Sequence, residues 1–103
     1  MLLTGIRILD LTDRKASFCS KLLADLGARV IKVERPGGGV SRKSGPFAGN
    51  LPDPEKSLSF FYNNTGKSGI TLDIEHKEGK KIFSELVTRN DAIVESFPPG
   101  YLT

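Results

Sequence analysis

The chain begins with a short apolar run, an amphipathic stretch and a second apolar run. Residues 6–11 and 30–33 are rich in branched apolar side chains, which is typical of buried strands. Between these runs, apolar residues recur with the spacing of one helix face, at Cys19, Leu22, Leu23 and Leu26. Thr12 and Asp13 are candidate caps for the start of this helix, and Gly27 suits its end. The pattern predicts a strand–helix–strand unit with Cys19 in the apolar stripe.

A second unit of the same kind is predicted over residues 70–95. Residues 70–75 alternate apolar and polar side chains, which indicates a strand with one wet face. A helical stripe follows, formed by Ile82, Phe83, Leu86 and Val87. Residues 91–95 make a fourth strand. Strands joined through helices run parallel, so we predict an α/β fold with a parallel or mostly parallel sheet of about four strands and flanking helices. Two helices cannot cover both faces of four strands, so we expect the chain to be part of a larger fold.

Between the two units, residues 35–56 form a loop rich in glycine and proline. This composition excludes regular structure over most of the segment. A loop of this length within a small domain is usually functional or mobile, and a disordered insertion is the alternative. Residues 57–62 are predicted to form a short helix or turn whose aromatic side chains pack on the sheet.

Length, charge and cysteine content limit the classes of function. The 103 residues suit one small domain, and the net charge of +3 suits an anionic ligand but is too weak to indicate nucleic acid. Cys19 is the only cysteine, so no internal disulfide is possible. The N-terminus does not resemble a signal peptide, and no apolar run is long enough to span a membrane. We therefore expect a cytoplasmic protein without a membrane or nucleic-acid partner.

Several familiar motifs are present only in part. Gly66-Lys67-Ser68 resembles the end of a phosphate-binding loop, but Phe61 stands where that motif requires its first glycine. The glycines after Glu34 follow the second strand, whereas a dinucleotide fingerprint follows the first. His76 and Cys19 have no partners at metal-binding spacing, so no metal site is predicted.

Two charged residues lie at the ligand-binding end of the predicted sheet. Asp10 stands near the end of the first strand, where a carboxylate could attack a thioester. We favour a structural role for Asp10, in which it accepts backbone N–H groups of the following turn, since nothing nearby in sequence is evidently placed to tune its pKa. Arg35 leaves the second strand just before the glycines, and its guanidinium could pair with a phosphate. A surface ion pair is the alternative for Arg35.

Five segments, taken in order, resemble the N-terminal part of family III CoA-transferases, the group of formyl-CoA and carnitine-CoA transferases. They are GIRILDLT (5–12), LLADLGARVIKVERPG (22–37), NTGKSGITLDI (64–74), EG (78–79) and VESFPPG (94–100). The resemblance covers essentially the entire chain. It implies that residues 1–103 are the N-terminal segment of a CoA-binding, Rossmann-like domain, in an enzyme that moves coenzyme A between an acyl-CoA and a carboxylic acid. It also implies an interlocked homodimer.

The resemblance also implies which residues bind coenzyme A. Arg35 would contact the nucleotide phosphates, and Leu72 would flank the adenine. Lys67 lies in a basic turn of the family, and its charge would favour binding of the coenzyme. The CoA channel would be lined by Ser96, Phe97, Pro98 and Tyr101. The nucleophilic aspartate of the family lies beyond Thr103, so no catalytic residue is assigned within this chain, and we expect the chain by itself to be inactive.

Two alternatives remain open at this stage. The α-methylacyl-CoA racemases are similar over this region and bind the same cofactor, but they move a proton instead. The second alternative is that the chain is a non-catalytic binding or assembly module derived from this fold. The charged residues Asp13-Arg14-Lys15, which replace a small apolar stretch usual in the family, favour that last alternative.

Overall fold

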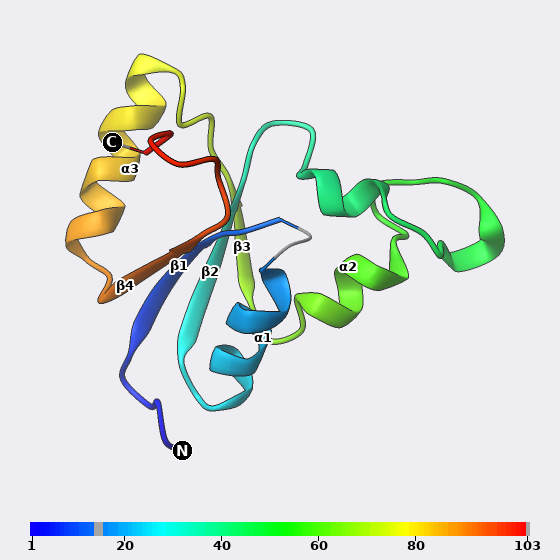
Figure 1. The fold of residues 1–103 in the computed structure, drawn as a ribbon, viewed down its shortest axis with the longest axis horizontal. Helices are drawn as coiled ribbons and strands as arrows, with labels where there is room; N and C mark the ends of the chain where they lie inside the picture. Colours follow the sequence, from blue (N-terminus) through cyan, green and yellow to red (C-terminus); the bar gives the residue numbers. More distant parts are fainter. Residues whose placement is uncertain (14–15, 103) are drawn as a thin grey trace.

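Four strands form a single parallel sheet. The computed structural model describes residues 1–13 and 16–102, and its strands are β1 (Arg7–Leu11), β2 (Arg29–Glu34), β3 (Ser68–Thr71) and β4 (Ala92–Glu95). The order across the sheet is β3-β2-β1-β4, and every neighbouring pair runs parallel (Figure 1). The predicted α/β fold class is confirmed. The first two strands form the centre of the sheet, and β3 and β4 form its edges.

Helices lie on both faces of the sheet because side chains of a strand alternate between the faces. Ile8 and Val30 belong to a core cluster with Leu23 of α1 (Ser17–Asp25). The other cluster contains Leu9, Leu11 and Val33, against which Phe83, Leu86 and Val87 of α3 (Lys77–Thr88) pack. Figure 1 shows α3 on one side of the sheet and α1 with α2 (Leu58–Asn63) on the other.

The predicted apolar stripe of the first helix is wrong at three of its four positions, and only Leu23 packs against the core. Cys19 is exposed, and Leu22 and Leu26 are also exposed, at 46% and 43%. The buried residues of α1 are instead Ser17 and Ser20. These serines face a polar cluster under the helix, described below, so tertiary contacts override the hydrophobic pattern. The predicted side-chain caps are also absent, because the helix follows Ala16 and no side chain caps it.

The third strand is shorter than predicted. It ends at Thr71, whereas the alternation of side chains extends to Glu75. The reason is a turn at Asp73, whose carboxylate accepts the backbone N–H of Glu75 and whose carbonyl accepts that of His76. Gly79, in the first turn of α3, packs so closely on the Asp73 carbonyl that an added Cβ would collide with it. The strand therefore stops early to let α3 begin against this turn.

An ion pair between Arg42 and Glu34 helps to hold residues 35–56 to the sheet. The segment contains two short 3-10 helices, η1 (Val40–Lys43) and η2 (Ala48–Asn50). The Arg42 guanidinium donates from Nε and Nη2 to the two carboxylate oxygens of Glu34, at 2.8 and 2.9 Å. The face of the same guanidinium lies over the ring of Phe60, with Cζ 3.9 Å from the ring centroid. Phe60 is the buried aromatic residue of α2. Arg42 thus joins the loop, β2 and α2.

Replacing Arg42 by methionine tests this anchor. We expect Arg42→Met to lower the free energy of unfolding by roughly 2 kcal/mol, because Glu34 loses a charged, two-pronged partner. Urea denaturation measures the change. Lys43→Met removes a neighbouring exposed cation and should have an effect below about 0.5 kcal/mol. Equal effects of the two substitutions would contradict the role of Arg42.

Candidate functional site

A pocket of about 540 Å³ lies where β1, β2 and β4 end. Parallel α/β sheets place ligands at this end of their strands. Six of the seven residues predicted to bind a ligand line the pocket together: Arg35, Leu72, Ser96, Phe97, Pro98 and Tyr101. Lys67 does not line it. The tertiary structure therefore gathers residues separated by more than sixty positions in sequence around one space.

Asp13 connects three walls of this pocket. Its carboxylate accepts the backbone N–H groups of Val40 and Ser41, at 2.9 and 2.6 Å, at the start of η1. Its own N–H donates to the Ser96 hydroxyl, 3.1 Å away. Hydrogen bonds of Asp13 thereby connect the three segments that follow β1, β2 and β4. The charged segment that departs from the family pattern continues through Arg14 and Lys15, which lie outside the described residues.

The opposite wall combines apolar, aromatic and charged side chains. The rings of Phe97 and Tyr101 lie 4.5 Å apart, and the Tyr101 hydroxyl donates to Glu75 at 2.6 Å. Arg35 is exposed and lines the pocket, and its guanidinium forms no ion pair or hydrogen bond with another described residue, although its backbone carbonyl accepts the N–H of Gly38. The alternative of a surface ion pair for Arg35 therefore finds no partner among residues 1–13 and 16–102.

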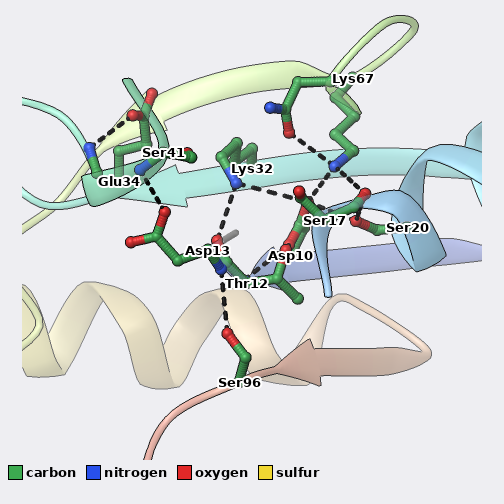
Figure 2. Close-up of polar contacts among 12 residues, drawn as sticks. Asp10, Thr12, Asp13, Ser17, Ser20, Lys32, Glu34, Ser41, Lys67 and Ser96 are labelled. Atoms are coloured by element: carbon green, nitrogen blue, oxygen red, sulfur yellow. Dashed lines mark hydrogen bonds and ion pairs between the residues drawn. The ribbon is translucent and has the colours of Figure 1, made fainter. Parts of the chain in front are cut away.

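Beside the pocket, Asp10 lies in a buried polar cluster (Figure 2). Its carboxylate is fully buried and accepts Lys67 Nζ at 2.7 Å and the Ser20 hydroxyl at 2.7 Å on one oxygen. The other oxygen accepts both the backbone N–H and the hydroxyl of Thr12. Lys32 Nζ stands 3.9 Å from the first oxygen. The interpretation that Asp10 organises the turn after β1 is confirmed by its bond to the Thr12 N–H.

The expectation that nothing near Asp10 tunes its pKa is wrong. Burial, the largest single effect, would raise the pKa of this carboxyl, but it is outweighed by the charge of Lys32 and the hydrogen bond from Lys67 together with two weaker effects. Bonds from the Thr12 and Ser20 hydroxyl groups act in the same direction. The pKa of Asp10 therefore lies below its ordinary value, and the carboxyl is a buried carboxylate. A carboxylate held in this way by four donors is suited to fixing structure and poorly suited to attack a thioester.

One sequence signal could have revealed this cluster. Asp10 and Lys32 are the charged residues inside the otherwise apolar stretches 8–11 and 30–33, and they are register partners across β1 and β2. Opposite charges in adjacent buried strands point to a pair, because an unpaired buried charge is costly. The contribution of Lys67 had no such signal, because Lys67 reaches Asp10 from a turn 57 positions away along the chain.

The described residues contain neither a cluster of metal-ligating side chains nor a helix suited to span a membrane. Among residues 1–13 and 16–102, no three His, Cys, Asp or Glu side chains gather as a metal site. Within the same ranges, no helix combines the length and apolar character needed to cross a membrane. His76 caps α3 by accepting the N–H of Glu78 on Nδ1.

Replacing Asp10 by asparagine tests the charge of the cluster. At pH 7 we expect Asp10→Asn to lower the free energy of unfolding by roughly 3 kcal/mol, because two buried lysines lose their counter-charge. The folded-state pKa is depressed, so the unfolded chain takes up the proton first as pH falls. The difference in free energy of unfolding between wild type and Asp10→Asn should be largest above about pH 4, the ordinary pKa of an aspartate. It should shrink as pH falls below that value. Urea denaturation at pH 7 and pH 3 measures both differences.

The matched control for this prediction is Asp25→Asn. Asp25 pairs with Lys21 at 2.9 Å on the surface of α1, with half of its side chain exposed. Exposed pairs contribute less than about 1 kcal/mol, so this substitution should have little effect at either pH. A difference between wild type and Asp10→Asn that is the same at pH 7 and pH 3 would contradict a charged Asp10.

Comparison with known proteins gives a consistent result. The family model of CoA-transferase family III matches residues 3–103. The succinyl-CoA:(R)-benzylsuccinate CoA-transferase subunit BbsE of Thauera aromatica is 42% identical over 96 residues, which are 93% of this chain and 23% of that protein. The formyl-CoA:oxalate CoA-transferase of Bradyrhizobium diazoefficiens is 45% identical over 104 residues, covering 97% of this chain and 23% of the relative.

Solved structures agree with the sequence relatives. A CAIB/BAIF family protein from Brucella suis superposes with a TM-score of 0.82 at 36% identity, over 96% of this chain and 26% of that one. A hypothetical protein from Mycobacterium tuberculosis gives a TM-score of 0.82 at 37% identity, over 97% and 26%. The chain spans about a quarter of the length of the curated relatives it matches. On this sequence and structural evidence, the chain belongs to CoA-transferase family III.

Proposed function

We propose that the pocket at the ends of β1, β2 and β4 binds coenzyme A, as the N-terminal part of the CoA site of a family III CoA-transferase. The observation that carries the proposal is the gathering of Arg35, Leu72 and the 96–101 segment around one space. Family membership supplies the reaction class, since the relatives are CoA-transferases. The pocket supplies a place for the cofactor.

Arg35 is the proposed contact for a phosphate, in a lining that also holds the carboxylates of Asp13, Glu34, Asp73 and Glu75. Lys32 donates to the Thr12 carbonyl and lies beside Asp10, and Glu34 is occupied by Arg42. Arg35 is the cation in the lining that has no such partner among the described residues. A guanidinium can take two phosphate oxygens at once, and glycines just after it let the backbone approach closely. The diphosphate of coenzyme A fits this arrangement.

The apolar part of the lining suits the rest of the cofactor. Leu72 offers an apolar surface for the adenine, and Phe97 and Tyr101 offer aromatic faces along the channel. Ser96 contributes a hydroxyl that already accepts from Asp13. Sites for small ligands combine a mostly apolar lining with a few placed polar groups, as this one does.

The substrates are an acyl-CoA and a carboxylic acid, between which the enzyme moves coenzyme A. We assign to this chain the binding of coenzyme A and no covalent step, because Asp10 is committed to its four donors. A nucleophilic aspartate outside residues 1–103 would perform that step. An interlocked homodimer in the cytoplasm remains our expectation for the protein, on the family resemblance.

Binding of coenzyme A by the chain tests the proposal. We expect weak binding, with a dissociation constant above the low-micromolar range, because the open pocket offers one unpaired cation among its described residues. Arg35→Ala should weaken binding by roughly tenfold or more, the scale of one lost charged contact. NMR titration with coenzyme A measures constants in this range, and calorimetry covers tighter binding.

Arg29→Ala is the matched control. Arg29 is exposed at the first residue of β2, whereas Arg35 follows the last, so the two arginines flank opposite ends of one strand. Removing Arg29 should leave the dissociation constant within about twofold of wild type, because charges at that distance are screened by salt. An equal loss for both variants, or no binding by the wild-type chain, would refute the assignment.

A further inference from the structure

Two lysines hold the two ends of the turn between β1 and α1. Lys32 Nζ donates to the carbonyl of Thr12 at 2.9 Å, where β1 ends. Lys67 Nζ donates to the carbonyl of Ser17 at 3.0 Å, where α1 begins. Both ammonium groups approach the same Asp10 oxygen, at 3.9 and 2.7 Å. Figure 2 shows both lysines directed at this carboxylate, between the strands and α1.

Lys67 has its hydrogen-bonding capacity fully used inside the cluster. Its side chain is 2% exposed, and its ammonium donates to Asp10, Ser17 and Asn64, with Asn64 Oδ1 at 2.7 Å. An ammonium has three N–H donors, so none remains for a ligand. Asn64 is itself oriented by donating to the carbonyl of Phe60 in α2. The position of Lys67 is therefore determined by protein contacts alone.

The turn that Lys67 and Asp10 hold carries a wall of the pocket. Thr12, bonded to Asp10 through both its N–H and its hydroxyl, lines the pocket, as does Asp13. Asp13 in turn accepts Val40 and Ser41 N–H groups. A continuous chain of contacts thus leads from Lys67, outside the pocket, through Asp10 and Thr12 to the start of η1.

A purely stabilising role does not account for this arrangement well. Buried ion pairs recover their desolvation cost only with ideal partners, and apolar replacements are often as stable. Here the charged groups are directed at backbone atoms of one turn, Thr12 O, Ser17 O and Thr12 N. Three bonds fix the backbone at Thr12 and Ser17, on either side of the turn, which apolar packing would not do.

We infer that Lys67 is a positioning residue for the coenzyme A pocket, acting through Asp10 on the turn at Thr12 and Asp13. The inference rests on the proposed function for its effect on coenzyme A binding. It differs from the expectation that Lys67 acts on the ligand through its own charge. The effect on the pocket wall does not depend on the identity of the ligand.

Lys67→Met is the test, with two readouts on the full chain. We expect amide hydrogen exchange at Val40 and Ser41, measured relative to the Ala28 amide, to become faster by roughly tenfold, because Asp13 is no longer held in place. Ala28 donates to Leu23 near the start of β2 and serves as the internal reference. NMR titration should show coenzyme A binding weakened by roughly tenfold, the usual scale of coupling within one bonded network.

Leu86→Ala is the stability control. Leu86 of α3 packs on the other face of the sheet, against the cluster of Leu9, Leu11 and Val33, and it does not line the pocket. This variant should lower the melting temperature without changing relative exchange at Val40 and Ser41 or the affinity, at a temperature where all variants are folded. Equal changes in Lys67→Met and Leu86→Ala would overturn the inference.

If Lys67→Met does not fold, the double variant Asp10→Asn/Lys67→Met removes both charges and keeps the comparison possible. It still lacks the bond to the Ser17 carbonyl, so fast exchange at Val40 and Ser41 should persist. Weaker binding with unchanged exchange would show that Lys67 acts directly on the ligand, and would also overturn the inference. If wild type fails to bind coenzyme A, the proposed function fails, while the exchange result still decides the role of Lys67.

Discussion

A carboxylate with no contact with water must be compensated within the protein, and the geometry of this site depends on how Asp10 is compensated. The hydrogen-bond donors come from Thr12 after β1, from α1 and from the turn before β3, and β2 adds the charge of Lys32. Because each donor must arrive within hydrogen-bonding distance, the buried charge restricts how those parts can be arranged. The serines buried under α1 and the shortened apolar stripe of that helix follow from the same requirement.

The same restriction separates charges that hold the structure from charges that can meet a ligand. Lys32, Lys67, Glu34 and Arg42 are engaged with partners inside the fold. Arg35 projects from the end of β2 with no partner among the described residues, beside an aromatic and apolar wall. This division leaves the Arg35 guanidinium as the cation that a ligand could meet in the described lining of the pocket, and the proposed coenzyme A site rests on it.

The chain covers about a quarter of each curated relative, and its surface is consistent with a part of a larger fold. Phe18, Leu22 and Tyr62 are exposed on α1 and α2, and Ile93 is exposed on the edge strand β4. Phe18 and Tyr62 stack with centroids 6.5 Å apart, which shields only part of their apolar area. Exposed aromatic side chains grouped in this way usually contact further protein.

Local patterns in the sequence predicted the four strands, the two helices that connect them in pairs, and the order of these elements along the chain. They did so because apolar periodicity reflects which face of each element is buried. The place of Arg35 in the lining of the pocket was also predictable, since it follows directly from the end of a strand. Tertiary structure decided the rest. It ended β3 at Thr71, because the Asp73 turn and the close packing of Gly79 require α3 to begin there. It also buried serines of α1 in place of Cys19 and brought Lys67 to Asp10, because contacts between distant segments outweigh local preference where a buried charge has to be paired.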